Sequence, residues 1–250
     1  MEHWVERPSD PLDLTLSWRA PESVPDRLRW AVGVLSVRGP QPTFRYLQGE
    51  EFCQANLGRD EAQLEAYGYR GYPTFSWRPG EGQEFVSGVL DAFLRRLPPT
   101  VRPDFSKYLE LFRYRGTPLS PMKLLALTAA KLPSDGFSLV DRLDPMSTAC
   151  DLVLEIVGFR HRVQKPQRLR NGIELRLVAE PDHQIDPSAV KVQVEDRTIG
   201  YINRLQASSV STWMRTRSVS CWLLRMNGRP DSPVAYAFLR MRDNKSALAA

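Results

Sequence analysis

Residues 177–203 read LVAEPDHQIDPSAVKVQVEDRTIGYIN, and this stretch decides the fold of the C-terminal part of the chain. An apolar strand runs into an acidic turn that contains Pro181 and Pro187. Because proline fixes φ and lacks an N–H, neither residue fits a central strand. Two further strands are predicted after the turn, at 190–194 and 198–202. The stretch therefore predicts a small antiparallel sheet with one proline-bounded, carboxylate-rich turn.

Apolar residues alternate with a period of two on both sides of this stretch, which is typical of strands. We expect additional strands at 152–157, 173–177, 219–226 and 234–241, with a helix at 205–214. Six short strands with one helix favour a small β-barrel.

The preceding part of the chain mixes both periodicities. Strands are predicted at 28–37, 43–47 and 136–140, and helices at 60–67, 84–97, 104–114 and 120–131. The predicted fold class is therefore α+β: a mixed domain at 26–142, a linker at 143–150, and a small OB-like barrel at 151–242. Residues 1–25, which contain four prolines, are expected to be irregular, and residues 243–250 form a tail.

Composition places the chain among globular proteins. It has 250 residues, of which 42% are hydrophobic and 25% charged. We find no apolar run near the roughly 18 residues of a membrane-spanning helix, and no apolar signal core after Met1. Three scattered cysteines favour a reducing compartment. A cytoplasmic location without membrane contact is expected.

The positive charge is concentrated in the C-terminal part. Residues 149–250 hold 16 basic and 10 acidic residues, whereas the remainder holds 18 and 19. Such a basic surplus favours a nucleic-acid partner, and the alternative is a solvated loop without a ligand. Possible base-stacking side chains are Phe159, His161, Tyr201 and Trp213. The basic side chains at 159–176 are Arg160, Arg162, Lys165, Arg168, Arg170 and Arg176.

Three blocks occur in a characteristic order: V-G-F-R at 157–160, E-P-D-x-x-x-D-P-x-A-V-x-V at 180–192, and I-G-Y-I at 199–202. Together they resemble the HIRAN domain, over about residues 151–242. This small β-rich module is best known for binding DNA ends in helicase-like transcription factors and related remodellers. The resemblance implies an OB-like fold that binds DNA, with single strands or 3′ ends as the expected ligand.

The resemblance also implies roles for individual residues. Arg160 would contact phosphate, and His161 would stack on a base where the family has a tyrosine. Asp186 would accept a hydrogen bond from a terminal 3′-hydroxyl. Ile185 stands where an aromatic is expected, and losing one base stack costs roughly 1–3 kcal/mol. The other candidate nucleic-acid contacts are Arg162, Lys165, Arg168, Asp182, His183 and Tyr201.

A second resemblance involves 44–47, 89–99, 124–127 and 136–140, whose order is similar to that in the N-terminal subdomain of HipA-type toxin kinases. It implies a bacterial-type protein in which residues 26–142 bind a protein partner or have a regulatory role. We find no glycine-rich phosphate loop, H-x-D loop or D-F-G ligand, so no kinase activity is expected.

Three functions remain open on sequence grounds. The first is a DNA-binding HIRAN protein that is not an enzyme and carries no metal or cofactor. The second is a protein-interaction or toxin–antitoxin accessory factor without DNA binding, which an exposed apolar patch around Phe93 and Phe112 would favour. The third is a metal-dependent nuclease or hydrolase that uses Asp182 and Asp186. Turn hydrogen bonds explain these two carboxylates more simply.

Overall fold

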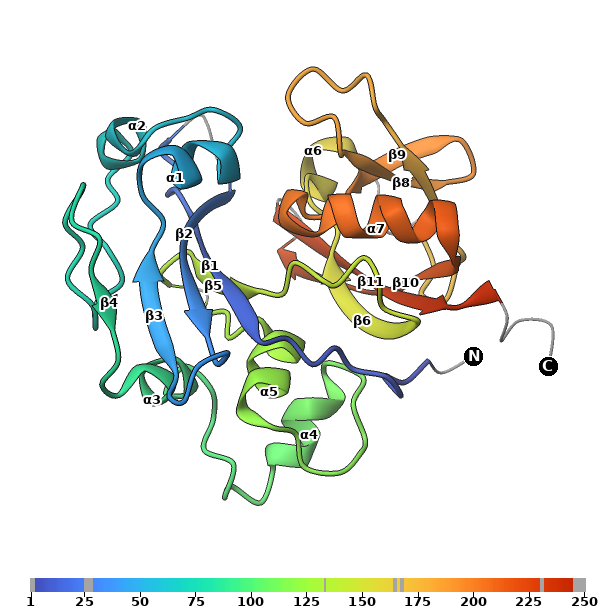
Figure 1. The fold of residues 1–250 in the computed structure, drawn as a ribbon. Coiled ribbons are helices and arrows are strands. Elements are labelled where there is room, and N and C mark those ends of the chain that lie inside the picture. The colour runs from blue at the N-terminus through green and yellow to red at the C-terminus, as the bar shows by residue number, and fades with distance from the viewer. Residues whose placement is uncertain are drawn as a thin grey trace. The chain divides into compact units, whose positions relative to one another are not determined.

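The computed structural model describes residues 3–24, 29–132, 134–163, 166, 169–229 and 232–244. The chain divides into two compact units (Figure 1). The N-terminal unit comprises residues 10–105 and 118–142, and the C-terminal unit comprises residues 1–9, 106–117 and 143–250. Each unit therefore draws on separate stretches of chain, whereas the sequence predicts domains that follow one another.

The N-terminal unit is built on a five-stranded antiparallel sheet in the order β4-β3-β2-β1-β5. Its strands are β1 (Asp13–Arg19), β2 (Arg29–Ser36), β3 (Thr43–Tyr46), β4 (Glu84–Phe85) and β5 (Phe137–Val140). The predicted strands at 28–37, 43–47 and 136–140 are confirmed.

Strand β1 corrects the expectation that residues 1–25 are irregular. The prolines of this segment flank the strand, and none lies within Asp13–Arg19. β1 pairs with β2 on one side and with β5 on the other, and its five inner residues are buried. A segment that reads as irregular from its prolines thus forms an inner strand of the sheet.

Helices accompany this sheet, and their ends follow local chemistry. Asp60 and Gln63 form a capping box that starts α2, and Ser120 accepts a hydrogen bond from the Lys123 amide at the start of α5. The helix predicted at 84–97 is too long, because its first residues pair with β3 and Gly88, with a φ of 62°, begins the helix. The helices are α1 (Gly49–Ala55), α2 (Glu61–Ala66), α3 (Val89–Leu94), α4 (Phe105–Glu110) and α5 (Pro121–Thr128).

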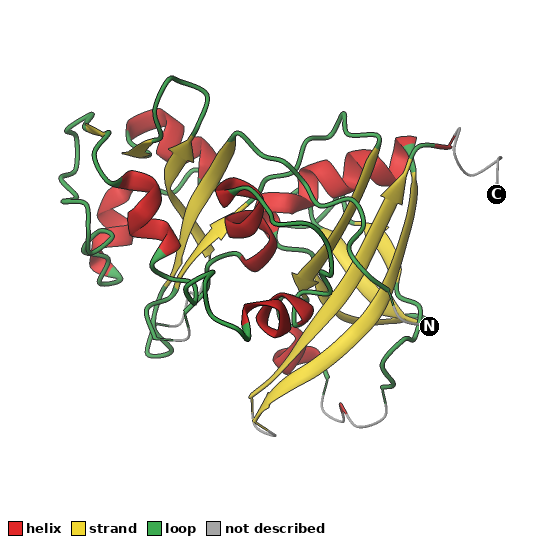
Figure 2. Cartoon of the chain, turned by 90° about the horizontal axis from the view of Figure 1, so that it is seen from below, coloured by secondary structure: helices red, strands yellow, loops and turns green. Residues whose placement is uncertain are grey.

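The C-terminal unit contains two three-stranded antiparallel sheets, β10-β11-β6 and β7-β8-β9. Figure 2 shows the two long strands β10 and β11 curving side by side. The elements are β6 (Ala149–Glu155), α6 (Phe159–Arg162), β7 (Arg176–Ala179), β8 (Val190–Val194), β9 (Arg197–Tyr201), α7 (Arg204–Thr216), β10 (Ser218–Arg229) and β11 (Ser232–Arg242).

The two sheets meet at two isolated antiparallel bridges, Val157 with Tyr201 and Glu174 with Trp222. These bridges link β6 to β9 and the start of β7 to β10, so all six strands contribute to one hydrophobic core. The predicted α+β class with a small OB-like module is confirmed, but in the part of the chain that the structure describes the module's strands form two sheets and no barrel closed by continuous hydrogen-bonded ladders.

Trp213 belongs to this core rather than to a binding surface. Its side chain on α7 is fully buried, and its indole N–H donates to the Asp144 carbonyl at 3.1 Å. Phe159 is also buried, at 2% exposure. The sequence-based suggestion that these two aromatics could stack on bases is therefore wrong, because both rings are packed in the hydrophobic core.

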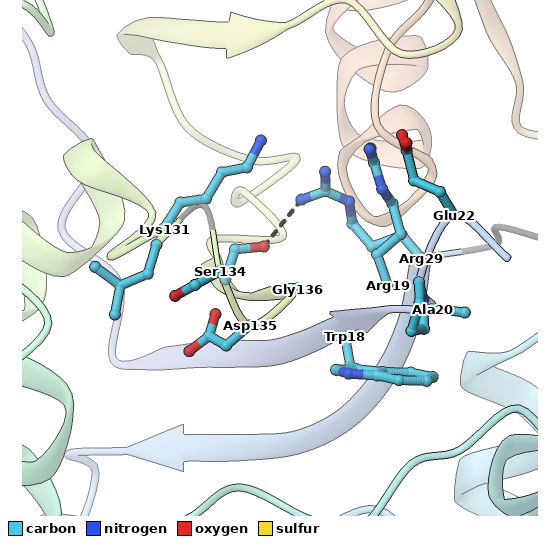
Figure 3. A pocket seen from close by; sticks show the side chains of 12 residues that line it. Trp18, Arg19, Ala20, Glu22, Arg29, Lys131, Ser134, Asp135 and Gly136 are labelled. Atoms are coloured by element: carbon cyan, nitrogen blue, oxygen red, sulfur yellow. Dashed lines mark hydrogen bonds between the residues drawn. The ribbon is translucent and has the colours of Figure 1, made fainter.

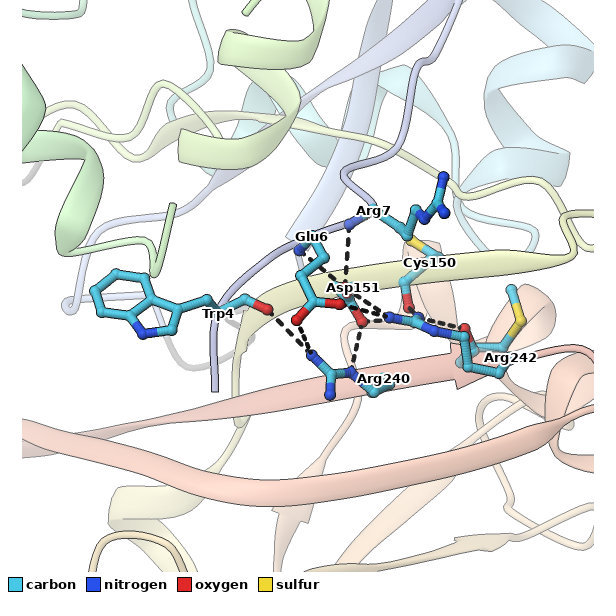
Figure 4. Close-up of polar contacts among 8 residues, drawn as sticks. Trp4, Glu6, Arg7, Cys150, Asp151, Arg240 and Arg242 are labelled. Carbon is cyan, nitrogen blue, oxygen red and sulfur yellow. Dashed lines mark hydrogen bonds and ion pairs between the residues drawn. The ribbon is translucent and has the colours of Figure 1, made fainter. Parts of the chain in front are cut away.

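Residues 3–9 are bound to the C-terminal unit by the buried carboxylate of Asp151 (Figure 4). Asp151 Oδ2 accepts hydrogen bonds from the amides of Glu6 and Arg7, at 3.0 and 3.1 Å. Arg240 Nε and Arg242 Nη2 donate to the same carboxylate at 3.0 and 2.9 Å. The Asp151 cluster, formed by these five residues, thus joins the N-terminal segment to β6 and β11.

Candidate nucleic-acid interface

A short basic helix, α6, follows β6 because of Gly158. Gly158 adopts a left-handed conformation with a φ of 78° and forms the N-cap. Phe159 then inserts into the core. The sequence predicts a strand at 152–157, but the ladder stops at Glu155, and the residues after Gly158 turn into α6. Arg160, His161 and Arg162 therefore lie on one helical turn.

Gly200 brings β9 against the chain that leads into α6. A Cβ atom at this position would lie 2.4 Å from Ile156 Cγ2 and 2.6 Å from the Val157 carbonyl oxygen. Only glycine fits at this position, and its lack of a side chain lets the two segments approach each other closely. Tyr201 can therefore form its bridge with Val157, through backbone hydrogen bonds of 2.8 and 2.9 Å. The glycine of the I-G-Y-I block thus positions Tyr201 beside α6.

Tyr201 is the centre of a polar cluster on the surface of the unit. Arg162 Nη2 donates to Tyr201 Oη at 3.3 Å, and its guanidinium lies 4.8 Å from the ring centroid. Tyr201 Oη donates to Glu180 Oε2 at 3.1 Å, and Lys191 Nζ lies 2.6 Å from Glu180 Oε1. The His183 ring packs edge-on against Tyr201, with 5.6 Å between centroids. We call these five residues the Tyr201 cluster.

The charge state of the cluster follows from these contacts. Partial burial raises the pKa of Tyr201, and its hydrogen bond to Glu180 adds to this, while Arg162 opposes it. The hydrogen bond from Lys191 lowers the pKa of Glu180. At neutral pH the phenol is therefore protonated and the carboxylate is ionised, so the cluster presents cations, an aromatic ring and one anion together.

The turn at 180–189 is shaped by its own polar side chains. His183 Nδ1 accepts hydrogen bonds from the amides of Ile185 and Asp186, at 3.3 and 3.1 Å. Asp186 Oδ1 accepts from the Ser188 amide at 2.9 Å, which is an Asx turn. These hydrogen bonds stabilise the turn, and Ile185 lies on it with 57% of its surface exposed.

The two arginines of α6 have different neighbours. Arg160 Nε donates to His161 Nε2 at 3.1 Å, and Arg160 Nη1 donates to Ser232 Oγ at 3.2 Å. Arg162 instead contacts Tyr201. One turn of helix thus directs one guanidinium toward the start of β11 and the other toward the Tyr201 cluster.

Most of the residues that the sequence singles out lie on three neighbouring segments. Arg162 and His183 each contact Tyr201, and Asp182, Ile185 and Asp186 share the turn with His183. Arg160 and His161 are on α6. Lys165 and Arg168 lie outside the described residues.

Sequence reasoning assigned no role to Glu180 or Lys191, although both belong to the cluster. A signal was available, because β8 and β9 form a hairpin whose register pairs Lys191 with Tyr201. The bond from the Glu180 amide to the Ala189 carbonyl, at 2.8 Å, continues the neighbouring ladder. If the pairing of β7, β8 and β9 is extended outward from the turns that connect them, Glu180, Lys191 and Tyr201 are placed together.

Within the described residues, no group of three or more His, Cys, Asp or Glu side chains converges to hold a cation. Asp186 uses one oxygen for its Asx turn. The described helices are also too short or too polar to cross a bilayer.

Comparisons with known proteins find a family model and solved structures that are similar to part of this chain. Residues 150–245 match the family model of the HIRAN domain. Among solved structures, the HIRAN domain of human HLTF is 16% identical and covers 40% of this chain and 81% of its own, with a TM-score of 0.33. A Lactobacillus plantarum protein is 22% identical and covers 38% and 95%, with a TM-score of 0.32. No curated protein matches this chain.

Proposed function

We propose that the HIRAN domain at residues 150–245 binds DNA through α6, the 180–189 turn and Tyr201. HIRAN domains form a DNA-binding family, which supports this assignment. The observation that carries it is the Tyr201 cluster, where a guanidinium, an aromatic ring and a shaped turn adjoin. This combination suits a nucleotide, which presents a phosphate, a base and sugar hydroxyls.

Each segment would bind a different part of the strand. Arg160 and Arg162 supply guanidinium groups for phosphate oxygens, which they can bind through two parallel hydrogen bonds. Tyr201 and the exposed His161 supply rings for base stacking. Because stacking requires unpaired bases, the surface favours single strands or frayed ends over duplex DNA.

The turn would provide selectivity for a 3′ end. Asp186 carries one carboxylate oxygen beyond the one that accepts from Ser188. That oxygen can accept a hydrogen bond from a terminal 3′-hydroxyl, and its charge disfavours a 3′-phosphate. Ile185 provides an exposed apolar contact for the last base in place of an aromatic ring.

The proposal is tested by fluorescence anisotropy of the full chain with a short labelled single strand across a salt series. Arg160→Ala with Arg162→Ala is expected to weaken binding and to reduce the salt slope by about 1.4, since each lost phosphate contact removes roughly 0.7. The matched control is Arg197→Ala with Arg215→Ala, which removes the same charge from β9 and α7. Equal losses in both double variants would reject α6 as the binding surface.

End selectivity has its own test with strands that end in 3′-hydroxyl or 3′-phosphate. The protein is expected to prefer the hydroxyl end. Asp186→Asn keeps an oxygen for the Ser188 amide but removes the charge, so the preference should shrink while general binding persists. An unchanged preference would exclude Asp186 from end recognition.

For residues 26–142 the proposal retains a partner-binding or regulatory role. The apolar patch considered around Phe93 and Phe112 is not exposed as a whole, because Phe93 is fully buried and Phe112 is partly buried. Exposed large apolar side chains occur in this range at Val86, Val101 and Leu111, with 47%, 89% and 56% exposure. These three positions are the ones to substitute when a partner is tested.

A further inference from the structure

A groove of about 700 Å³ runs between the edges of the two sheets of the C-terminal unit. β7 is the outermost strand of one sheet, and β10 is the outermost strand of the other. The groove is lined by the start of β7 and the two residues before it, by the end of α7 with the start of β10, and by the turn between β8 and β9.

The two strands are joined at one end of the groove and separate along it. The Leu175 amide donates to the Cys221 carbonyl at 2.8 Å, and the Leu223 amide donates to the Ile173 carbonyl at 2.9 Å. Among the described residues, no backbone pairing joins β7 to β10 beyond Leu175. Both strands therefore have an open edge from that point.

The open edge of β7 presents backbone donors and acceptors to the groove. Alternate residues of a strand direct their N–H and C=O groups to opposite sides. The Leu175 amide points toward β10, whereas the Glu180 amide bonds to the Ala189 carbonyl on the β8 side. Leu177 and Ala179 therefore direct their amides and carbonyls to the open edge. Such an edge is a template for a further strand.

The cavity of the N-terminal unit, of about 280 Å³, has no comparable edge (Figure 3). It is lined in part by β1 and β2, and each of these strands is paired on both sides. Arg29 Nη1 also donates to Ser138 Oγ at 2.9 Å. The groove beside β7 is thus the hollow in which strand backbone remains open.

Apolar side chains line the groove on the side of the hydrophobic core. Leu175 is buried, and Leu177, Met214 and Val219 are partly buried and pack against the core. Residues directly opposite each other in an antiparallel pair have their side chains on the same face. A strand added to β7 would therefore direct every second side chain toward these apolar residues.

The rim of the groove carries two carboxylates that are available to a cation. Arg176 pairs with Asp196 at 3.0 Å, and Arg217 donates to two backbone carbonyls. Glu174 and Glu195 are exposed, and neither side chain has an ion pair or hydrogen bond to another residue that the structure describes. This rim repels phosphate and complements lysine or arginine side chains.

We propose that the groove binds an extended basic segment of another protein, which adds to β7 as an antiparallel strand. Main-chain hydrogen bonds to Leu177 and Ala179 supply affinity, and alternating side chains supply selectivity. Apolar side chains of the segment face Leu177, and its basic side chains reach Glu174 and Glu195.

This site is separate from the proposed DNA surface. Glu195 lies in the turn at one end of the β8–β9 hairpin, whereas Lys191 pairs with Tyr201 at the other end. The peptide proposal therefore stands or falls without the DNA proposal.

The test is fluorescence anisotropy of the full chain with the labelled peptide K-V-K-V-K-V-K. Saturable binding is expected, and K-K-K-K-V-V-V, of the same composition, should bind more weakly because its valines do not alternate. In K-V-K-P-K-V-K, proline removes the amide that pairs with β7, so affinity should fall about fivefold. No saturable binding, or equal binding of the three peptides, would overturn the proposal.

Variants of the chain locate the peptide. Ala179→Pro removes an amide from the open edge and leaves the ladder with β8 intact, so it should weaken binding about fivefold. Glu174→Gln with Glu195→Gln should weaken it about threefold, and less at high salt. The matched control is Glu50→Gln with Glu65→Gln, which removes the same charge from exposed positions of the N-terminal unit. Equal affinity in the Glu174 double variant and its control would reject the site.

Two measurements decide between this occupant and its alternatives. Sedimentation velocity at rising concentration should show a monomer; a dimer that Ala179→Pro abolishes would assign the edge to a second copy of the chain and overturn the proposal. Arg160→Ala with Arg162→Ala should bind the alternating peptide with unchanged affinity. Loss of peptide binding in that variant would place the peptide on the DNA surface instead of the groove.

Discussion

The Asp151 cluster and the Tyr201 cluster are both built from carboxylates and cations of the C-terminal unit, yet they occupy different environments. The Asp151 side chain is fully buried, whereas that of Glu180 is 24% exposed. Burial acts to raise the pKa of Asp151, but hydrogen bonds from Arg242, Glu6 and Arg240 outweigh it, so the pKa is lowered. At Glu180 the lowering comes mainly from Lys191.

The difference shows how burial decides the role of a polar cluster. A buried charge that loses its partners leaves unsatisfied groups without access to water, so the Asp151 cluster is costly to disturb. Exposed ion pairs contribute only about 0–1 kcal/mol, because water replaces the lost contacts. The Tyr201 cluster, in which Glu180 and Lys191 are 24% and 28% exposed, should therefore cost the fold less to rearrange than the Asp151 cluster.

Removing the buried carboxylate should have the largest effect. Asp151→Ala leaves Arg240 and Arg242 without their shared acceptor and frees the amides of Glu6 and Arg7. We expect the free energy of unfolding to fall by about 3–5 kcal/mol, measured by urea denaturation.

Asp196→Ala is the control for this comparison. Asp196 also pairs with an arginine, Arg176, but its side chain is 95% exposed. Its removal should change the free energy of unfolding by no more than about 1 kcal/mol. Similar losses in both variants would show that burial does not distinguish the two environments.

Gly200→Ala tests the link between the fold and the binding surface. The added Cβ would collide with Ile156 Cγ2 and the Val157 carbonyl, so the bridge to Tyr201 should open. We expect a loss of about 1–3 kcal/mol in stability together with weaker DNA binding. Gly82→Ala, with open space around its Cβ position, should change neither property. Normal DNA affinity in Gly200→Ala would show that the bridge between Val157 and Tyr201 is not needed for DNA binding.

Two substitutions at Tyr201 distinguish the contribution of its ring from that of its hydroxyl. Tyr201→Ala should weaken single-strand binding by about 1–3 kcal/mol through loss of stacking. Tyr201→Phe removes only the bonds to Glu180 and Arg162 and should cost less. Anisotropy titrations compare the two affinities, and a larger loss in Tyr201→Phe would assign the role to the hydroxyl.

Local patterns predicted the elements whose cause is local. Ser120 and Asp60 marked helix starts, and Pro181 with Pro187 marked the turn, since caps and prolines act within a few residues. Strand β1 was missed because the prolines on either side of it led to the prediction of an irregular segment. The helix at 84–97 was overextended because Phe85 also fits an apolar helical pattern, although in the folded chain it pairs with Phe44.

The candidate site was predicted in part for the same reason. The three sequence blocks located α6, the turn and Tyr201, but not the cluster that joins them. Glu180, Lys191 and the bridge at Val157 depend on how strands pair across the module. The register of a pair is selected by burial of whole faces, which a single segment does not encode.

By itself, the sequence determined the α+β class and the motif of the HIRAN domain, because periodicity, turns and a family's motif are carried by neighbouring residues. Only the tertiary structure decided which distant segments join. The Glu6 amide reaches Asp151 across 145 residues, and Arg19 faces Arg29 only once β1 and β2 have paired. Such contacts depend on the energy of the complete fold, where burial selects one pairing among many that local patterns allow.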